Sequence, residues 1–190
     1  MNILALITVC TNLAYISAFD DATRNPAWVA YDLEPCEIVI TNRDSFSFRA
    51  DPRLHDSNNA DDYAKSGYDR GHLAPAADFN FDRNALAETY LYSNVCPMLP
   101  SVNRGEWAEI EAEVRRLAKS SNDTVHVLTW PEYHYAVFGT NLMGRVHVPF
   151  SFHKVAWGKF GARHWVVFNF KLGGECRSVG KTHNKKEGTK

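Results

Sequence analysis

The feature that most constrains the fold is a single amphipathic helix predicted over residues 103–119. Its apolar residues Trp107, Ile110, Val114 and Leu117 recur at i, i+3, i+7 and i+10, which is the spacing of one helical face. Such an apolar stripe has to be buried against another element. The segments available to cover it are short and strand-like. The chain is therefore predicted to be one α+β domain.

Apolar or alternating runs predict the strands. They fall at residues 3–10, 14–19, 28–33, 37–41, 125–129, 146–150 and 164–170. A second helix is predicted over residues 84–92. The polar stretch at 49–68 is predicted to be a long surface loop, and loops of that length are more often functional than not.

The first apolar run, ILALITVC at residues 3–10, raises the question of a leader. It is long enough for the core of a signal peptide and too short to span a membrane. No Lys or Arg precedes it and no small-x-small cleavage site follows before Tyr15, so we interpret it as a buried strand. A cleaved leader and a secreted protein are the alternative, and the localisation stays open. The predicted organisation is an N-terminal segment at 1–13, a domain at 14–172 and a basic polar tail at 173–190, with no membrane partner.

Charge and cysteine content narrow the classes of protein. The formal net charge is −1, which argues against a generic nucleic-acid coat, because such proteins are usually basic. Acidic residues outnumber basic ones in residues 1–100, and the balance reverses in residues 101–190. We therefore expect an active cleft where the two halves meet, with cations concentrated there. The four cysteines form no CxxC pair, which argues against a structural zinc ribbon.

Two groups of residues indicate chemistry. His72 follows Gly71 in a polar segment, and an imidazole titrates close to working pH, as a general base requires. On the predicted helix, Asn103 and Glu111 share one face, and Glu111 leans back toward Asn103. An amide oxygen and a carboxylate suit Mg²⁺, which keeps several waters and few protein ligands. Asn103 with Glu106 also fits a helix N-cap with a capping box, and the two interpretations are compatible.

The same segments carry a family resemblance. SGYDRGHLAPAADF at 66–79 and LYSNVCPMLPSVNRGEWAEIE at 91–111 resemble the DNA/RNA non-specific endonuclease family, the DRGH nucleases. TRNPAWVAYDL, FRADP and VHVPFSFHKV extend the resemblance, which runs from about residue 14 to about residue 170. It implies a ββα-metal (His-Me finger) fold, with a central, mostly antiparallel sheet flanked by helices. Here the fold is expected to be shortened at its C-terminal side, because only residues 171–190 remain.

The resemblance also implies an activity. A family member of this kind is a Mg²⁺-dependent endonuclease, with Mn²⁺ as a substitute ion. It hydrolyses phosphodiester bonds of DNA and RNA with little sequence preference and leaves 5′-phosphate ends. The family resemblance allows a homodimer.

Individual roles are carried over by position. His72 matches the general base, Asn103 the direct protein ligand of Mg²⁺, and Glu111 the acid that holds a metal-bound water. Asn94 matches the asparagine that supports the His72 loop and the reacting phosphate. Three arginines are predicted to bind substrate, the first two also as catalytic groups: Arg49, Arg70 and Arg104.

Two alternatives come from other functional classes. One is a relative that binds nucleic acid or a partner without cutting it, although the presence of His72, Asn103 and Glu111 argues against this. The other is a metal-dependent phosphodiesterase that acts on a different substrate with the same site.

Overall fold

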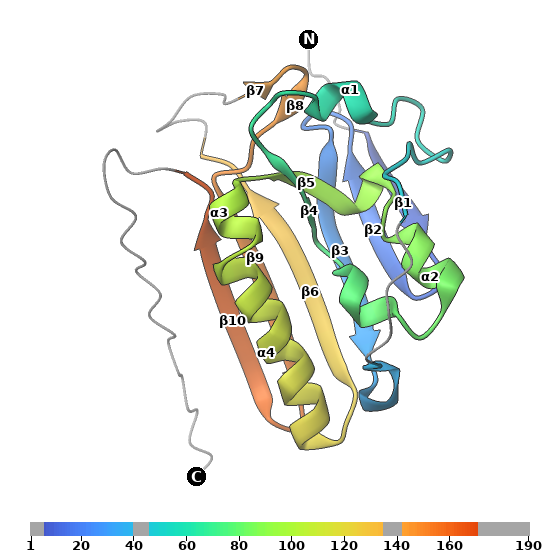
Figure 1. Cartoon of the computed structure of the whole chain (residues 1–190), viewed down its shortest axis with the longest axis vertical. Helices are drawn as coiled ribbons and strands as arrows, with labels where there is room; N and C mark the ends of the chain where they lie inside the picture. Colours follow the sequence, from blue (N-terminus) through green and yellow to red (C-terminus); the bar gives the residue numbers. More distant parts are fainter. Residues whose placement is uncertain (1–5, 40–45, 135–141, 171–190) are drawn as a thin grey trace.

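A six-stranded antiparallel sheet dominates the computed structural model, which describes residues 6–39, 46–134 and 142–170 (Figure 1). The strands lie in the order β1-β2-β3-β6-β9-β10, and each pairs with its neighbours in antiparallel register. Their bounds are β1 Ile7–Thr11, β2 Tyr15–Asp20, β3 Asn25–Leu33, β6 Val125–Glu132, β9 Ser151–Gly158 and β10 Gly161–Phe168. The prediction of an α+β fold on an antiparallel sheet is confirmed.

The remaining elements are short, apart from one helix. Two small two-stranded sheets pair β4 (Asp69–His72) with β5 (Val95–Met98), and β7 (Leu142–Met143) with β8 (Val146–His147). The helices are α1 Ala60–Tyr63, α2 Arg83–Glu88, α3 Pro100–Asn103 and α4 Glu106–Ser121, and the 3₁₀ turns are η1 Pro35–Glu37, η2 Ala76–Phe79 and η3 Tyr92–Asn94. The described helices include none that is long and apolar enough to cross a membrane.

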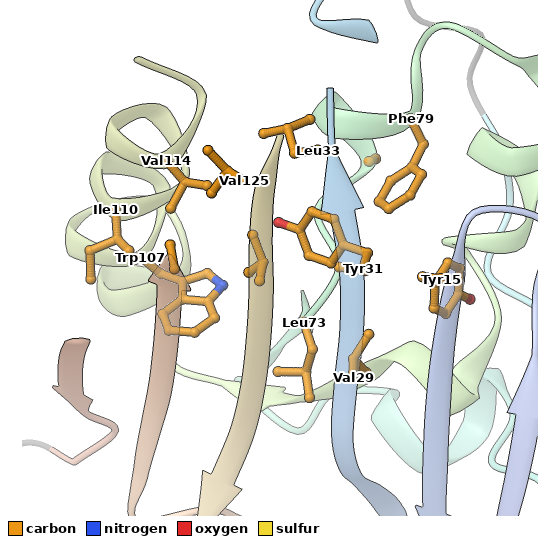
Figure 2. Close-up of a cluster of buried hydrophobic side chains, with 14 of the residues drawn as sticks. Tyr15, Val29, Tyr31, Leu33, Leu73, Phe79, Trp107, Ile110, Val114 and Val125 are labelled. Carbon is orange, nitrogen blue, oxygen red and sulfur yellow. The ribbon is translucent and has the colours of Figure 1, made fainter. Parts of the chain in front are cut away.

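Helix α4 packs on one face of the sheet and buries the predicted apolar stripe. All four residues of the stripe are buried, and Trp107 and Val114 are completely inaccessible. Figure 2 shows Trp107, Ile110 and Val114 gathered with Tyr31 of β3 and Val125 of β6 in the space between helix and sheet. The β4–β5 sheet crosses the same face beside α4 (Figure 1). The core therefore supports the elements that carry His72 and Glu111.

Strand β1 differs from its prediction in burial. A strand does form at the predicted place, and it pairs with β2 at the edge of the sheet. The expectation that it is buried is wrong, because Ile7 is 46% exposed and Val9 is 60% exposed, while Cys10 faces the core. An edge strand covered on one face only leaves alternate residues in solvent.

Other local predictions also need correction. Glu37 belongs to the η1 turn and not to a strand, and residues 40–41 of that predicted strand lie outside the described part. The predicted helix at 84–92 is the shorter α2, followed by the η3 turn. The loop at 49–68 contains α1 and buries Asp51 and Asn58, so it is more ordered than a plain surface loop. The predicted basic tail at 173–190 lies wholly outside the described residues.

Candidate active site

The pairing of β4 with β5 fixes the place of His72. The register pairs Gly71 with Cys96 and His72 with Val95, so the DRGH segment is a strand and His72 stands at its end. Gly71 permits this close pairing, because a Cβ at that position would lie 2.7 Å from the Met98 Cβ. A larger residue at this position would separate β4 from β5 and move His72.

Hydrogen bonds from buried groups fix the backbone around His72. The indole Nε1 of Trp107 donates to the His72 carbonyl at 3.0 Å. The Leu73 N–H donates to the Asn94 carbonyl at 2.9 Å. The side chain of Asn94 brackets Ala74, accepting from its N–H and donating to its carbonyl, each at 2.9 Å. Asn94 is fully buried, so the structure places it as a support of this loop.

Aromatic rings flank the imidazole of His72. The Phe48 ring centroid lies 5.2 Å from the imidazole centroid, and the Tyr90 ring meets it edge-on at 5.2 Å. Packing on two sides restricts rotation of the imidazole. The ring is therefore held in one orientation by its neighbours as well as by its backbone.

Asn103 is the last residue of α3 and not the N-cap of α4. The N-cap is Gly105, which supplies no side-chain hydrogen bond, so the predicted capping box with Glu106 is wrong. The reason is the extra helical turn α3, which ends just before α4 begins. A Cβ on Gly105 would lie 2.5 Å from the Ser101 carbonyl oxygen, so only glycine allows the two helices to meet this closely.

Asp69 orients the amide of Asn103. The Asn103 Nδ2 donates to Asp69 Oδ2 at 3.0 Å, and the Arg104 guanidinium donates to both carboxylate oxygens at 2.8 Å. Burial alone would raise the pKa of Asp69, but the hydrogen bonds from Arg104 and Asn103 outweigh it and hold this pKa below its ordinary value. Because Nδ2 faces Asp69, the other branch of the amide presents Oδ1, the atom that can bind a cation.

Helix α4 contributes Glu111 and, one turn later, Arg115. The Arg115 guanidinium donates to the buried carboxylate of Asp78 at 2.7 Å, and the Tyr31 hydroxyl donates to the same carboxylate at 2.7 Å. Burial raises the pKa of Asp78, while the charge of Arg115 and the two hydrogen bonds oppose that rise. Sequence reasoning missed Arg115. Its i+4 spacing from Glu111, on the same helical face, was the available signal.

These side chains converge on one cavity of about 230 Å³, which we call the polar pocket. It is lined by His72, Pro75, Ala76, Ala77, Tyr90, Asn103, Ala108, Glu111 and Arg115. Strand β4 and helices α3 and α4 thus bring the predicted base, metal ligand and acid together. The pocket also draws on both halves of the chain, as the charge distribution suggested. The expected concentration of cations is not found in its lining, where Arg115 is the one Lys or Arg side chain.

The polar pocket offers oxygen donors for a cation. The Asn103 amide and the Glu111 carboxylate are hard ligands of the kind that Mg²⁺ takes, with water filling its other positions. Among the described residues, no three His, Cys, Asp or Glu side chains are grouped to hold a metal. The Asn103–Glu111 pair as a metal site stays a prediction.

The predicted arginines stand outside the lining of the polar pocket. The Arg70 Nε donates to the Tyr92 hydroxyl at 3.0 Å, and its guanidinium packs against aromatic rings. Arg49 is exposed and donates to the Ala87 carbonyl at 2.7 Å. Arg104 is paired with Asp69, as described above. A substrate contact by any of the three stays a prediction.

Comparisons with known proteins agree with this geometry. Residues 7–170 match the family model described as DNA/RNA non-specific endonuclease. The chain is 33% identical over 176 residues to "Endonuclease G, mitochondrial" of Bos taurus, covering 82% of this chain and 58% of that protein. It is 38% identical over 125 residues to "Mitochondrial nuclease" of Saccharomyces cerevisiae, covering 63% of this chain and 37% of that protein.

A solved structure shares the fold. The crystal structure of the EndoG/EndoGI complex superposes with a TM-score of 0.77 at 29% identity, covering 87% of this chain and 75% of that chain. The chain spans 58% of the length of the endonuclease G proteins that it matches. The family match over residues 7–170 includes the six-stranded sheet and all the residues that line the polar pocket.

Proposed function

The chain belongs to the DNA/RNA non-specific endonuclease family, and from this premise we propose that it hydrolyses phosphodiester bonds in DNA and RNA with the help of one hydrated Mg²⁺ ion. The observation that carries the proposal is the convergence of His72, Asn103 and Glu111 on the polar pocket. These residues come from β4, α3 and α4, and a proton acceptor beside two hard oxygen donors suits metal-assisted hydrolysis.

His72 acts as the general base. Its imidazole faces the polar pocket, where it takes a proton from the water that attacks phosphorus. The flanking rings of Phe48 and Tyr90 keep the imidazole from turning away. The bond from Trp107 to the His72 carbonyl holds the strand end that carries it. The base is thus already positioned before substrate arrives, which lowers the entropic cost of reaching the reactive geometry.

Asn103 and Glu111 would hold the ion, Asn103 through its amide oxygen and Glu111 through a water. Asp69 keeps the amide in the required orientation by accepting from Nδ2. When bound, Mg²⁺ supplies positive charge that offsets the negative charge developing on the phosphate and the leaving oxygen. Arg115 adds a second, permanent positive charge at the same pocket, fixed by its ion pair with Asp78.

Cleavage with little sequence preference, leaving 5′-phosphate ends, is the finer part of the proposal. The charged groups of the polar pocket are suited to a phosphate, which is the same in every nucleotide. DNA and RNA are therefore both expected as substrates.

The experiment compares the wild-type protein with His72→Ala in a plasmid-nicking assay with Mg²⁺, with and without EDTA. We expect the wild type to nick and linearise the plasmid, EDTA to abolish cleavage, and His72→Ala to lower the rate by about 10²- to 10⁴-fold, the range for loss of a general base. His126→Ala is the matched control, because His126 pairs with Asp32 away from the polar pocket.

Two results would contradict the proposal. Equal nicking by the wild type and His72→Ala would remove His72 as the base. Failure of the wild type to cut plasmid DNA or RNA in Mg²⁺, while it hydrolyses a small phosphodiester such as bis(p-nitrophenyl) phosphate, would assign the site to another substrate class.

A further inference from the structure

A charged residue, Lys154, lies in the core against the backbone that directly follows His72. Lys154, on β9, faces the α4 side of the sheet and is completely inaccessible to solvent. Its neighbours in the inward row of β9, Phe152 and Ala156, are the apolar residues expected of a core. A buried ammonium group carries a large desolvation cost, so a strand with this burial normally has an apolar residue in its place.

The ammonium group of Lys154 has specific partners. Its Nζ donates to the Leu73 carbonyl at 3.0 Å and to the Thr129 hydroxyl at 2.8 Å. It also lies 4.7 Å from the ring centroid of Trp107, within the range of a cation–π contact. Burial lowers the pKa of Lys154 to about 8, while the negative charges of Glu111 and Asp78 oppose that fall, so the group is mainly protonated at neutral pH.

The Leu73 carbonyl is the next link. Leu73 directly follows His72, and its N–H is already bonded to the Asn94 carbonyl. On the N-terminal side of Leu73, the Trp107 indole donates to the His72 carbonyl. On its C-terminal side, the Asn94 side chain bonds the N–H and the carbonyl of Ala74. Lys154 binds the Leu73 carbonyl, which lies between these two contacts. The three-residue segment at 72–74 is therefore bonded on successive backbone groups by side chains from β9, α4 and η3.

We propose that Lys154 is a positioning residue for the reaction, whose ammonium group fixes the Leu73 carbonyl and thereby the backbone that carries the His72 imidazole. The proposal rests on the nuclease function proposed above. Lys154 does not line the polar pocket and is completely inaccessible to solvent, so we expect no contact between it and substrate. It acts through the place of the base, and displacement of a catalytic group by about 1 Å can cost on the order of 10²-fold in rate.

The test uses Lys154→Met, which keeps most of the side-chain length and removes the charge and the hydrogen bonds. Steady-state kinetics on an oligonucleotide duplex in Mg²⁺ should show kcat lowered by about 10- to 100-fold, with KM within about threefold of the wild type. Hydrogen exchange should show faster exchange at the Leu73 and Ala74 amides. Val167→Ala is the control for core damage, because Val167 is buried in the same core on β10. It should lower the unfolding midpoint without these changes in kcat and exchange.

Thr129→Val provides a second, milder variant if Lys154→Met does not fold. It removes the other acceptor of the ammonium group on β6 and should lower kcat and speed exchange at residues 73–74 in the same direction. Folded Lys154→Met with kcat within about threefold of the wild type would overturn the proposal. So would a loss of kcat with unchanged exchange at 73–74, an equal loss in Val167→Ala, or wild-type kinetics and exchange in Thr129→Val where Lys154→Met is unfolded.

Failure of the proposed function looks different from failure of this inference. If the wild type cuts no nucleic acid, the kinetic comparison is lost, and that result counts against the nuclease assignment. The exchange measurement needs no substrate and no metal ion. Unchanged exchange at residues 73–74 in folded Lys154→Met therefore overturns the anchoring by Lys154 in either case.

Discussion

At the residue scale, the orientation of one amide group links the DRGH segment to the helical part of the site. Asp69 holds the nitrogen of the Asn103 amide and is itself held by Arg104. The first residue of the motif thus determines which atom of Asn103 is available to a cation. A partner of this kind behind a metal ligand typically contributes 10- to 100-fold in metal affinity, by rough estimate.

We therefore expect Asp69→Ala to raise the Mg²⁺ concentration that gives half-maximal activity by about 10- to 100-fold. The measurement is a Mg²⁺ titration of duplex cleavage, supported by calorimetric titration with Mn²⁺. Asp32→Ala is the control, since Asp32 is exposed and pairs with His126 away from the polar pocket. A half-saturating concentration equal to that of the wild type would show that Asp69 does not orient Asn103.

Sequence reasoning identified some of these residues and missed others for a physical reason. His72, Asn103 and Glu111 lie in local patterns, a polar segment with a glycine and one face of a predicted helix, and the family motifs include them. Asp69 and Lys154 act through contacts that only the fold creates. The Asp69–Asn103 hydrogen bond joins residues 34 positions apart, and the Lys154–Leu73 bond joins residues 81 apart. No local spacing encodes such pairs.

At the element scale, the elements that could be predicted were those with a regular repeat of apolar residues. The stripe on α4 was predicted because four apolar residues repeat at helical spacing against a polar background, and all four are buried. Strand β9 was not predicted, because Lys154 beside Phe152 in its inward row breaks the alternation of apolar and polar residues. The break between α3 and α4 was also missed, since it depends on the contact of Gly105 with the Ser101 backbone.

Another element-scale feature is the loop that precedes β4, which is pinned to the turn between β7 and β8. Arg145 in that turn donates to Asp62 at 2.6 Å and to Asp56 at 2.9 Å, and Arg24 pairs with Asp56 at 2.5 Å. The hydrogen bonds from Arg24 and Arg145 lower the pKa of Asp56 to about 2. Burial would raise the pKa of Asp62, but hydrogen bonds from Arg145 and the Asn59 backbone bring it below its ordinary value.

This pinning gives a pH-dependent prediction. The carboxyl pKa values are lower in the fold than in the unfolded chain, so the ion pairs stabilise the fold above about pH 4 and lose that effect as the pH falls toward 2. Arg145→Ala should therefore lower the unfolding midpoint at pH 7 by a few degrees, roughly 1 kcal/mol or less per exposed pair. The gap from the wild type should narrow as the pH approaches 2.

Thermal unfolding monitored by circular dichroism at a series of pH values measures this effect. Arg163→Ala is the control, because the Arg163 guanidinium donates to the carbonyl of its own neighbour Ala162 and this contact involves no carboxylate. A difference between Arg145→Ala and the wild type that stays constant across the pH range would mean that the ion pairs are not its source.

At the scale of the whole molecule, the net charge does not show how many cationic side chains face the polar pocket, and that number is small. The net charge is −1, and Arg115 is the cationic residue among those that line the polar pocket. Arg49, Arg70 and Arg104 are engaged with protein groups near it. Binding to nucleic acid should therefore release few counterions, since the release scales with the number of phosphates neutralised.

This distribution predicts a shallow salt dependence. Binding of a labelled DNA duplex by His72→Ala, measured by fluorescence anisotropy in a series of NaCl concentrations, should give a log–log slope of about −1 to −3. Adding Arg115→Ala to that variant should reduce the slope by about one. A slope near −6 or steeper would instead indicate a broad basic binding surface.

The anchoring of residues 72–74 has a consequence for the order in which the protein is made. Every residue that lines the polar pocket precedes β6 in the chain, whereas Lys154 lies on β9, which follows β6 and pairs with it. A nascent chain can contain His72, Asn103 and Glu111 while the residue that we propose as an anchor is still to be added. A nuclease whose base is secured only after β9 has been synthesised would reach its full rate later than the synthesis of its site residues alone would allow.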